Sequence, residues 1–536
     1  MACKPKTRIA VACGVGWFLL ILGACLIPIL EWVVKKKVER TVIIRTDSPV
    51  YAFWQDPPVP IYLQLYMFNV TNPIEFIQEG KRPFLQEVGP YTYSERRVKY
   101  DIKFNPNGTV TYRQNRTFQF ILEKSGKGLS EDDIYCTANP VYWSLYNALK
   151  YEYPLVRETI YIATQLFDEH PLMYRPFKEL IWGYHDPLLN VTKAIDPKWF
   201  YTDFIGFFMN KNNTNDGVYT VFTGETDIMK LGTIDKYNGS SYLNFWSTVW
   251  ANMINGTDGT LGPPYLPKDT VTHVFSSDIC RSVPGMYSRD VSSSQGIKLW
   301  RFIGPTSSLQ NATENPDNAG FCTPKDNCLG AGLNNITNCQ GVDFFNLPSA
   351  TSLPHFLHAD PRYLHAVVGL SPNEKLHETT LDIEPYTGLV LQANKRLQVN
   401  VHLEPIANVP ETLNITTVFL PIMWLDENAA IDDASAKKLE DLLFTPLKLI
   451  LGLEIGLMVL GVVVLTASII YCVKKKLENS EERRPLVQPN EYVDYDAPPQ
   501  ATGGNTVTYG GTNPILTGGG DGDNTVDRSA GTVRKV

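Results

Sequence analysis

Residues 9–30 read IAVACGVGWFLLILGACLIPIL and contain no charged side chain. An α-helix of this run is roughly 33 Å long, which is enough to cross a hydrocarbon core of about 30 Å. A cleaved signal peptide is the alternative, but the run is longer than the apolar region of most signals, and residues 28–31, PILE, make a poor small-residue cleavage site. We therefore predict an uncleaved transmembrane helix over residues 9–30.

A second apolar run lies near the other end of the chain. Residues 449–473 are apolar apart from Glu454, and Lys474, Lys475 and Lys476 follow them directly. This pattern predicts a second transmembrane helix over 449–473. We expect Glu454 at the outer membrane interface, where a carboxylate reaches water at little cost. An ion pathway or the pairing of the two helices is the alternative role for this residue.

N-glycosylation sequons decide on which side of the membrane the middle of the chain lies. Basic residues flank both ends of the first span, so the positive-inside rule is ambiguous there. All ten Asn-x-Ser/Thr sequons lie between the spans and none lies in the tail. They begin at Asn69, Asn107, Asn115, Asn190, Asn212, Asn238, Asn255, Asn311, Asn335 and Asn414. We therefore expect residues 31–448 to form a lumenal or extracellular glycosylated domain, with residues 1–8 and 474–536 in the cytosol.

The composition of the 536-residue chain favours a large, turn-rich body. Aromatic residues make up 11% of the chain, and its 38 glycines and 37 prolines indicate many turns rather than a helical bundle. The formal net charge is −8, and the mildly acidic body lacks the basic footprint that nucleic acid requires. We therefore expect a β-rich core and no nucleic-acid partner.

Hydrophobic periodicity predicts strands with helical insertions, that is, an α+β body. A strand after the turn at 105–108 alternates apolar residues at Val110, Tyr112, Phe118, Phe120 and Leu122. Another predicted strand carries Leu397, Val399, Val401 and Leu403. Between them a helix is expected to begin at Pro154 and to pack through Val156, Ile160, Ala163 and Phe167.

Residues 474–536 differ in kind from the body, because they repeat Gly, Thr, Asn and Asp and contain few large apolar side chains. Such a composition predicts a disordered cytosolic tail. Within it, Glu482 stands four residues before the pair Leu486 and Val487, as in acidic dileucine-type sorting signals that adaptor proteins bind. Tyr492 and Tyr495 are candidates for phosphorylation, with a merely solvated tail as the simpler interpretation.

Five of the nine cysteines lie in the body, where the compartment is oxidising. They are Cys136, Cys280, Cys322, Cys328 and Cys339. Because five is odd, one thiol stays free or pairs with another chain, and about fifteen pairing schemes are open. The isolated Cys136 is our candidate for the leftover thiol. Near the membrane, Cys3 and Cys472 are candidates for palmitoylation, with inert thiols as the alternative.

The sequence lacks the local motifs of common enzymes. We find no GxSxG elbow, HExxH helix, Walker A loop or CxxC pair, and we predict neither an enzyme nor a cofactor. A cluster of four histidines raises a metal site or a pH sensor: His355, His358, His365 and His377. No pattern of Cys, Asp or Glu ligands accompanies them, so ordinary packed or surface histidines are expected.

Ten short motifs follow one another along most of the chain. They are NVTNP from Asn69, EVGPYTY from Glu87, ELIWGY from Glu179, TNDGVY from Thr214, MINGTDG from Met253, SSDICRSV from Ser276, LPHF from Leu353, LDIEPYTG from Leu381, KRLQVN from Lys395 and LPIMWLDE from Leu420. In this order they resemble the class B scavenger receptors. Within that family, DNAGFC from Asp317, the following NCLGAG and Cys339 resemble the lysosomal integral membrane protein type two branch. The tail segment ERRPLV agrees with that branch, although Val487 stands where Ile or Leu is commoner.

The resemblance implies a fold: a twisted antiparallel β-barrel-like body between two spans, an apical helical bundle over about 141–184, and an apolar tunnel toward the membrane. It also implies two disulfides, Cys280 with Cys339 and Cys322 with Cys328. Cys136 has no family counterpart. A third bridge of some relatives would need cysteines where this chain has Ala251 and Gly320.

The resemblance further implies a non-enzymatic receptor that binds a lipid or protein cargo at its apex and passes sterol, fatty acid or phospholipid through its body. Its location would be lysosomes, late endosomes or the plasma membrane, and a homo-oligomer is compatible with the sequence. The apex segment 167–171 reads FDEHP, so like-charge repulsion argues against capture of anionic lipoproteins there. Two alternatives stay open, a surface adhesion or phagocytic receptor and a two-span ion channel, for which Glu454 is the only support.

Overall fold

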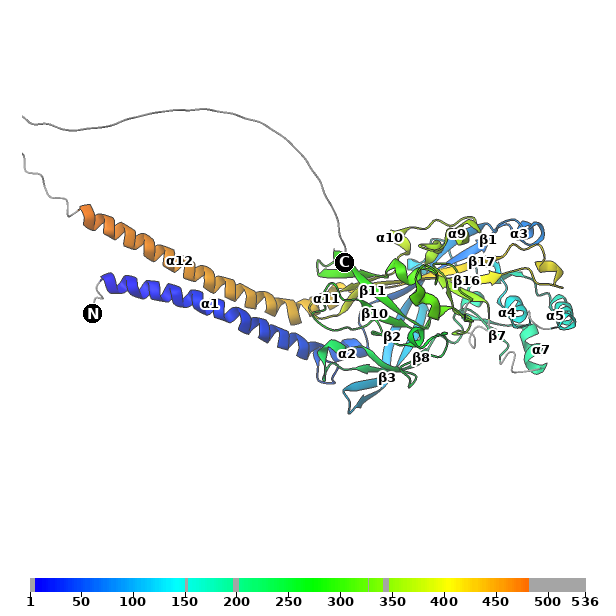
Figure 1. Cartoon of the computed structure of the whole chain (residues 1–536), viewed down its shortest axis with the longest axis horizontal. Helices are drawn as coiled ribbons and strands as arrows, with labels where there is room; N and C mark the ends of the chain where they lie inside the picture. The colour runs from blue at the N-terminus through cyan, green and yellow to red at the C-terminus, as the bar shows by residue number, and fades with distance from the viewer. Residues whose placement is uncertain (1–4, 150–152, 196–201, 326, 341–346, 482–536) are drawn as a thin grey trace, which may run out of the picture. The chain divides into compact units, whose positions relative to one another are not determined.

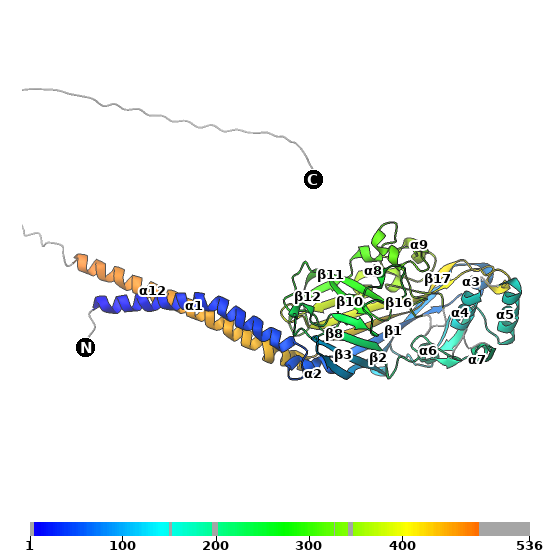
Figure 2. The same ribbon diagram turned by 60° about the horizontal axis from the view of Figure 1, so that its bottom comes forward.

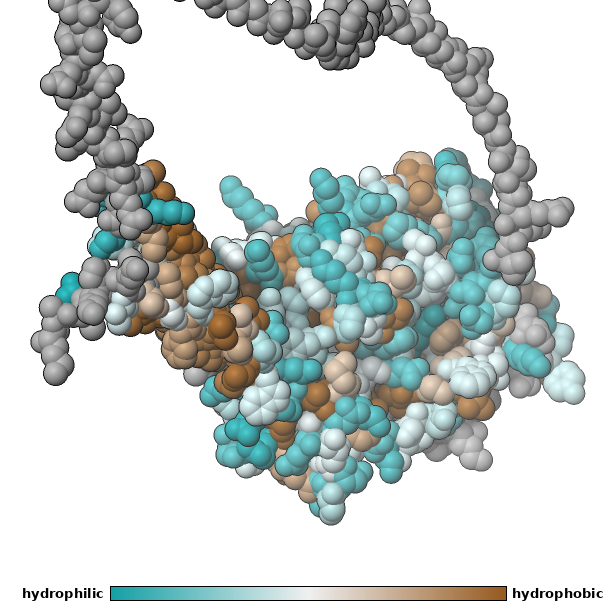
Figure 3. Space-filling view, turned by 60° about the vertical axis from the view of Figure 1, so that its left-hand side comes forward, coloured by the Kyte–Doolittle hydropathy of each residue, from teal (hydrophilic) through white to brown (hydrophobic). Residues whose placement is uncertain are grey.

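The computed structural model describes residues 5–149, 153–195, 202–325, 327–340 and 347–481. A long helix stands near each end of this part of the chain, α1 over Pro5–Val42 and α12 over Thr445–Glu481 (Figure 1). Both helices are long and apolar enough to cross a membrane, and their exposed side chains form a largely hydrophobic surface (Figure 3). Helix α1 runs beyond the predicted span because Val38 and Val42, 0% and 1% exposed, belong to the core of the body.

Glycines allow the two long helices to pack closely. A Cβ atom at Gly16 or Gly23 would lie 2.7 Å from side-chain carbons of Leu465 or Met458, respectively. A Cβ atom at Gly461 would lie 3.0 Å from the carbonyl oxygen of Gly16. Small residues at helix contacts let the two backbones approach one another.

Glu454 lies in the part of α12 that packs against α1. Its carbonyl oxygen is 3.7 Å from the position of a Cβ atom at Gly23, and the residue is only 7% exposed. The expectation that its carboxylate reaches water is therefore wrong for this structure, and the alternative role in helix pairing fits the burial better.

The body is built on one sheet of 13 strands, all of them antiparallel to their neighbours (Figure 2). The main path follows β10 (Thr272–Ser276), β11 (Arg281–Ser292), β12 (Lys298–Ile303), β15 (Thr380–Ile383), β16 (Val390–Leu403), β17 (Val418–Ala430), β1 (Ile61–Val70), β2 (Leu85–Asn105), β3 (Thr109–Phe120), β8 (Thr214–Phe222) and β9 (Ile234–Tyr237). Off this path, β14 (Ser349–Ser352) pairs with β16 and with β13 (Asn334–Asn335). This topology confirms the α+β class with a large antiparallel sheet.

Strand β3 shows the predicted alternation. Val110, Tyr112 and Phe118 are buried, at 0%, 1% and 8% exposure. The strand ends at Phe120, however, and Leu122 begins a 3-10 helix, η1 (Leu122–Lys124), with 60% of its surface exposed. The prediction that Leu122 continues the strand is therefore wrong, because the alternating pattern does not mark where pairing stops.

Strand β16 is covered on both faces. Val401 and Leu403 are fully buried, as predicted, whereas Leu397 and Val399 are half-buried because they line an internal cavity. The intervening Gln398 and Asn400 are also 0% exposed, and Nε2 of Gln398 donates to Oδ1 of Asn400 over 2.8 Å. Such buried amides persist because hydrogen bonds satisfy them.

One short segment contacts both edges of the sheet. No ladder joins β9 to β10 in the described part of the chain, so the sheet does not close by strand pairing. Thr257 instead forms an antiparallel bridge with Thr233 and a parallel bridge with Val274 of β10. The amide of Phe275 donates to the carbonyl of Thr257 over 2.9 Å, and the amide of Ile234 donates to that of Gly256 over 2.8 Å.

Helices gather at the two ends of the sheet (Figures 1 and 2). At one end stand α3 (Pro73–Glu79), α4 (Pro140–Leu149), α5 (Pro154–Leu166), α6 (Phe177–Trp182) and α7 (Pro187–Ile195). At the other end α2 (Pro49–Gln55) follows α1, and α11 (Asp433–Leu439) precedes a π-helical turn (Glu440–Phe444) and α12. Shorter helices lie between strands at α8 (Val249–Asn252), α9 (Pro361–His365) and α10 (Glu374–His377).

Helix α5 begins at the predicted residue. Pro154 occupies its first turn, and the predicted face packs on a cluster formed with α4 and α7 through Val156, Ile160, Ala163 and Phe167. The same cluster contains Leu188 and Leu189 of α7, outside the expected range of 141–184. The apical group thus includes one more helix than the resemblance implied.

Two disulfides cross-link loops of the body. Cys280 pairs with Cys339, and Cys322 pairs with Cys328, which are the partners that the resemblance implies. Cys136 is a free thiol that is 2% exposed, so it is not accessible to another chain. A Cβ atom at Gly320 would lie 2.8 Å from that of Ala251, so the positions of the third family bridge are neighbours here.

Candidate functional site

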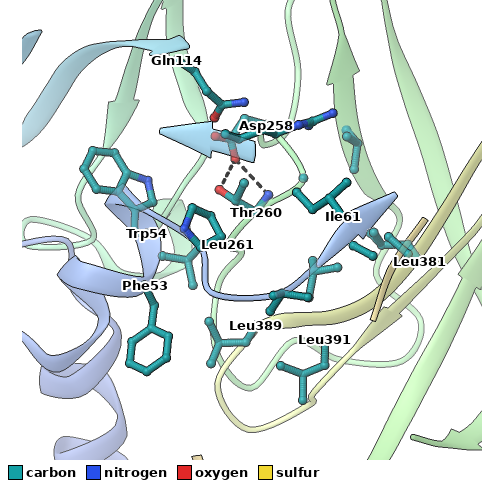
Figure 4. A pocket seen from close by; sticks show the side chains of 18 of the residues that line it. Phe53, Trp54, Ile61, Gln114, Asp258, Thr260, Leu261, Leu381, Leu389 and Leu391 are labelled. Carbon is teal, nitrogen blue, oxygen red and sulfur yellow. Dashed lines mark hydrogen bonds between the residues drawn. The ribbon is translucent and has the colours of Figure 1, made fainter. Parts of the chain in front are cut away.

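A cavity of about 300 Å³ lies in the body at the end where α1 and α12 join it. We call it cavity 1. Its lining includes Val42 of α1 and Leu439 of α11. Figure 4 shows apolar side chains that line cavity 1, which are Phe53, Trp54, Ile61, Leu261, Leu381, Leu389 and Leu391. The same view shows Asp258 held by the amide and hydroxyl of Thr260, at 3.0 and 2.5 Å. An apolar cavity with few oriented polar groups is the usual form of a ligand site.

Charged side chains gather at the inner side of cavity 1. This charged cluster consists of Arg97, Arg116, Lys395, Glu95, Asp278 and Glu427. Glu427 contacts all three cations: it pairs with Arg97, lies 3.5 Å from Nη2 of Arg116, and lies 3.7 Å from Nζ of Lys395. The three cations and three carboxylates balance one another.

Mutual pairing keeps the charged cluster ionised. Burial opposes ionisation of Asp278, but Lys395 and Arg116 hold its pKa well below the usual range. The pKa of Glu427 is lowered in the same way, because Arg97, Lys395 and Arg116 outweigh its burial. The pKa of Lys395 is raised in turn by Asp278 and Glu427, against its burial. Opposite charges within ion-pair distance of one another favour the charged forms of both groups.

Two further cavities adjoin the first. Cavity 2, of about 290 Å³, shares five lining residues with cavity 1: Val274, Ser276, Leu381, Ala393 and Lys395. Cavity 3, of about 70 Å³, reaches Phe207 and Phe208 and shares three charged residues with cavity 1: Arg116, Asp278 and Glu427. Cavities 1 and 2 therefore meet at a partly apolar wall, whereas cavities 1 and 3 meet at the charged cluster.

The charged cluster is not predicted by the sequence patterns above, although half of its residues stand within the family motifs. Three of its members stand inside the quoted motifs: Asp278 in SSDICRSV, Lys395 in KRLQVN and Glu427 in LPIMWLDE. Motif matching alone does not tell which residues contact one another in the folded protein. Only the fold brings them together, because 330 residues separate Arg97 from Glu427.

A buried acid pair lies in the apical helices. Glu169 is 7% exposed, and its Oε2 accepts a hydrogen bond of 2.5 Å from Nδ2 of Asn139. Burial, together with the nearby Asp186, raises the pKa of Glu169 to about 7. Asp186 is 1% exposed, and its Oδ1 accepts from the amide of Leu189 in α7. The pair therefore connects the end of α5 to the start of α7.

The structure brings together two of the four predicted histidines. His355 and His377 are 5% and 4% exposed, and their rings stack at 4.3 Å. Nε2 of His355 lies 2.5 Å from Oε2 of Glu87, and burial beside His355 lowers the pKa of His377 to about 4. His358 is 3.9 Å from Glu378, and His365 is exposed. In the described part of the chain no group of three or more His, Cys, Asp or Glu side chains is placed to hold a metal ion.

The sequon asparagines lie at or near the surface of the body. Six are exposed: Asn107, Asn190, Asn212, Asn238, Asn255 and Asn414. The other four are half-buried: Asn69, Asn115, Asn311 and Asn335. Cys472 is a free, half-buried cysteine. The remaining predicted positions lie outside the described residues: Cys3, Glu482, Leu486, Val487, Tyr492 and Tyr495.

Comparison with known proteins identifies the family. Residues 14–472 match the CD36 family. The chain is 38% identical to Lysosome membrane protein 2 of Homo sapiens over 435 residues, which cover 80% of this chain and 87% of the relative. It is 33% identical to Scavenger receptor class B member 1 of Sus scrofa over 480 residues, which cover 89% of this chain and 92% of the relative. The resemblance drawn from the motifs is thereby confirmed, and this chain belongs to the CD36 family of membrane proteins.

Proposed function

We propose that this protein is a non-enzymatic membrane receptor that holds a lipid in cavity 1 and passes it on through the body. The observation that carries this proposal is the partly apolar wall that cavities 1 and 2 share, whose apolar members are Val274, Leu381 and Ala393. Removing each methylene from water contributes about 0.8 kcal/mol, so such a route can hold an acyl chain or a sterol. Val42 and Leu439 set the outer end of cavity 1 beside the segments that continue into the long helices.

The proposed route is a tunnel inside a barrel-like body. Its support is the segment Gly256 and Thr257, whose carbonyls accept hydrogen bonds from Ile234 of β9 and Phe275 of β10, respectively, and which so narrows the opening between these strands. The charged cluster directs the route, because an apolar chain that entered cavity 3 would have to desolvate paired charges. The partly apolar wall toward cavity 2 offers the lower free-energy barrier to an apolar chain.

We further propose that helix α5 receives a lumenal protein cargo. Its outer side exposes large apolar side chains, with Leu155, Ile162 and Leu166 at 74%, 67% and 79% exposure. Exposed apolar patches of this kind mark interaction sites. The acidic Asp168 follows the helix, so an anionic lipoprotein is the less suitable partner.

A bulky side chain at the wall shared by cavities 1 and 2 tests the lipid function, because it would obstruct passage between them. We expect Ala393→Phe to lower the retention of radiolabelled cholesterol and oleate by the purified full-length protein about fifteenfold. The reason is that excluding as few as two methylenes from burial costs about 1.6 kcal/mol. The matched control is Ala407→Phe, which places the same ring on an exposed turn. Equal retention by both variants would remove the support for this route.

A second experiment tests delivery to lysosomes. We propose that both termini are cytosolic, that the glycosylated body is lumenal, and that adaptor proteins bind the tail through Glu482, Leu486 and Val487. The double change Leu486→Ala with Val487→Ala should then move the tagged protein from late endosomes and lysosomes to the cell surface, as measured by surface biotinylation. Tyr492→Ala with Tyr495→Ala serves as the control in the same tail. If the tagged protein lay at the cell surface both with and without the Leu486-Val487 pair, a surface adhesion or phagocytic receptor would be favoured instead.

A further inference from the structure

Among the described residues Arg281 has no carboxylate partner, and it lines cavity 2. It is the first residue of β11, directly after the disulfide-bonded Cys280. Its guanidinium carbon lies 3.6 Å from the centre of the Phe321 ring. Nη2 donates to the carbonyl of Ser308 over 3.3 Å and to Oδ1 of Asn318 over 3.4 Å. Both contacts are long and neutral, and they leave most of the five N–H donors of the guanidinium available.

Three other cations in this half of the body, Arg301, Arg396 and Lys395, have acid partners. Arg301 pairs with Asp382 through two hydrogen bonds of 2.7 Å, and Arg396 pairs with Asp426 at 3.1 Å. Lys395, which also lines cavity 2, pairs with Asp278 and Glu427. Among the described residues no carboxylate lies within ion-pair distance of Arg281. Glu378 shares the cavity, but it faces His358 at 3.9 Å.

Arg281 is half-buried, and partial burial without a counter-ion is costly for a guanidinium. Accordingly, burial alone lowers the pKa of Arg281 to about 10. An anion that entered cavity 2 would gain charge-assisted hydrogen bonds that no carboxylate among the described residues now makes. The apolar part of the lining suits a hydrocarbon chain, and it includes Val283, Phe302, Leu329, Leu333, Leu353 and Leu381.

We propose that Arg281 is the head-group site for an anionic single-chain amphiphile, whose carboxylate or phosphate binds the guanidinium while its chain lies along cavity 2 toward Ala393. This inference rests on the proposed lipid function and names the part of the route where charge is recognised. Entry through cavity 1 fits it, because cavities 1 and 2 share the lining residues Val274, Leu381 and Ala393. Neutral lipids occupy the same cavity without using Arg281.

Binding of matched lipids to the full-length protein in lipid-free micelles tests this site. The probes are oleate, oleoyl lysophosphatidate and the neutral oleyl alcohol. We expect Arg281→Gln to weaken oleate and lysophosphatidate binding roughly 10- to 100-fold, as loss of a charged hydrogen-bond partner does, and to leave oleyl alcohol unchanged. Arg281→Lys, which keeps the charge, should retain most of the oleate affinity. A larger loss for one of the two acids identifies which head group the site prefers.

The control is Arg289→Gln, which removes an exposed cation from the same strand. Equal loss of oleate and oleyl alcohol in Arg281→Gln would show that Arg281 only supports the structure, and no loss of either would also overturn the site. If the unchanged protein bound none of the three probes, the proposed lipid function itself would fail. Selective loss of the acids supports both proposals.

Discussion

Replacing Glu427 by alanine will lower the free energy of unfolding of the full-length protein by about 3 to 5 kcal/mol. Glu427 pairs with Arg97, Arg116 and Lys395, and its own side chain is only 11% exposed. Removing it leaves three cations with only Glu95 and Asp278 between them. An uncompensated buried charge is far more costly than a lost surface pair. Thermal and denaturant unfolding in detergent measure the loss.

The control for this prediction is an exposed ion pair of similar length. Glu79 lies 2.8 Å from Lys81, and the two side chains are 53% and 59% exposed. We expect Glu79→Ala to change stability by less than about 1 kcal/mol, because water screens such pairs. If Glu427→Ala proved as mild as Glu79→Ala, the charged cluster would not be a firm boundary between cavities 1 and 3. The route proposed for lipid would then extend to cavity 3 as well.

The apical helices will become less stable as the pH rises from 5 to 8. Glu169 has a pKa raised to about 7 in the folded protein, so the folded state holds its proton more tightly than the unfolded state does. The stabilisation is complete below the ordinary carboxyl pKa, and it is lost as the pH rises through about 7. The loss reaches up to about 3 kcal/mol, because each unit of pKa difference corresponds to about 1.4 kcal/mol.

Hydrogen exchange over residues 140–195 measures this effect, after correction for the intrinsic pH dependence of exchange. Glu169→Gln should make protection of this region independent of pH, because an amide keeps a hydrogen-bonding group beside Asp186 without ionising. Glu158→Gln, an exposed change in α5, should leave the pH dependence in place. Unaltered pH dependence in Glu169→Gln would assign the effect to another group, such as His170 beside Glu411. A positive result would mean that the apex is most rigid in an acidic compartment.

Local sequence patterns predicted several elements well. The uncharged run at 9–30 and the run at 449–473 each lie within a long apolar helix, because spanning a bilayer demands length and composition alone. Alternation in β3 and the face of α5 were visible for the same reason, since burial on one side imposes a period. The end of β3 was not visible, because strand pairing stops where the partner stops, and the partner is elsewhere in the sequence.

The motifs also carried the family, and with it the partners in both disulfides. Cysteine spacing by itself left the pairing open, because connectivity depends on how the loops meet. The burial of Glu454 was likewise undecided by its position in an apolar run. Packing of α1 against α12 determined it, through glycines on both helices.

By itself, then, the sequence determined the two apolar helices, the antiparallel α+β class and the family of this protein. Only the tertiary structure decided which charges meet, because ion pairing depends on distance in space and not along the chain. Arg97, Arg116 and Lys395 pair with carboxylates across the sheet, whereas Arg281 has no such partner in the part of the chain that the structure describes. In sequence these four cations look alike. Their surroundings pair three of them with carboxylates, and they place the fourth, Arg281, in the lining of cavity 2.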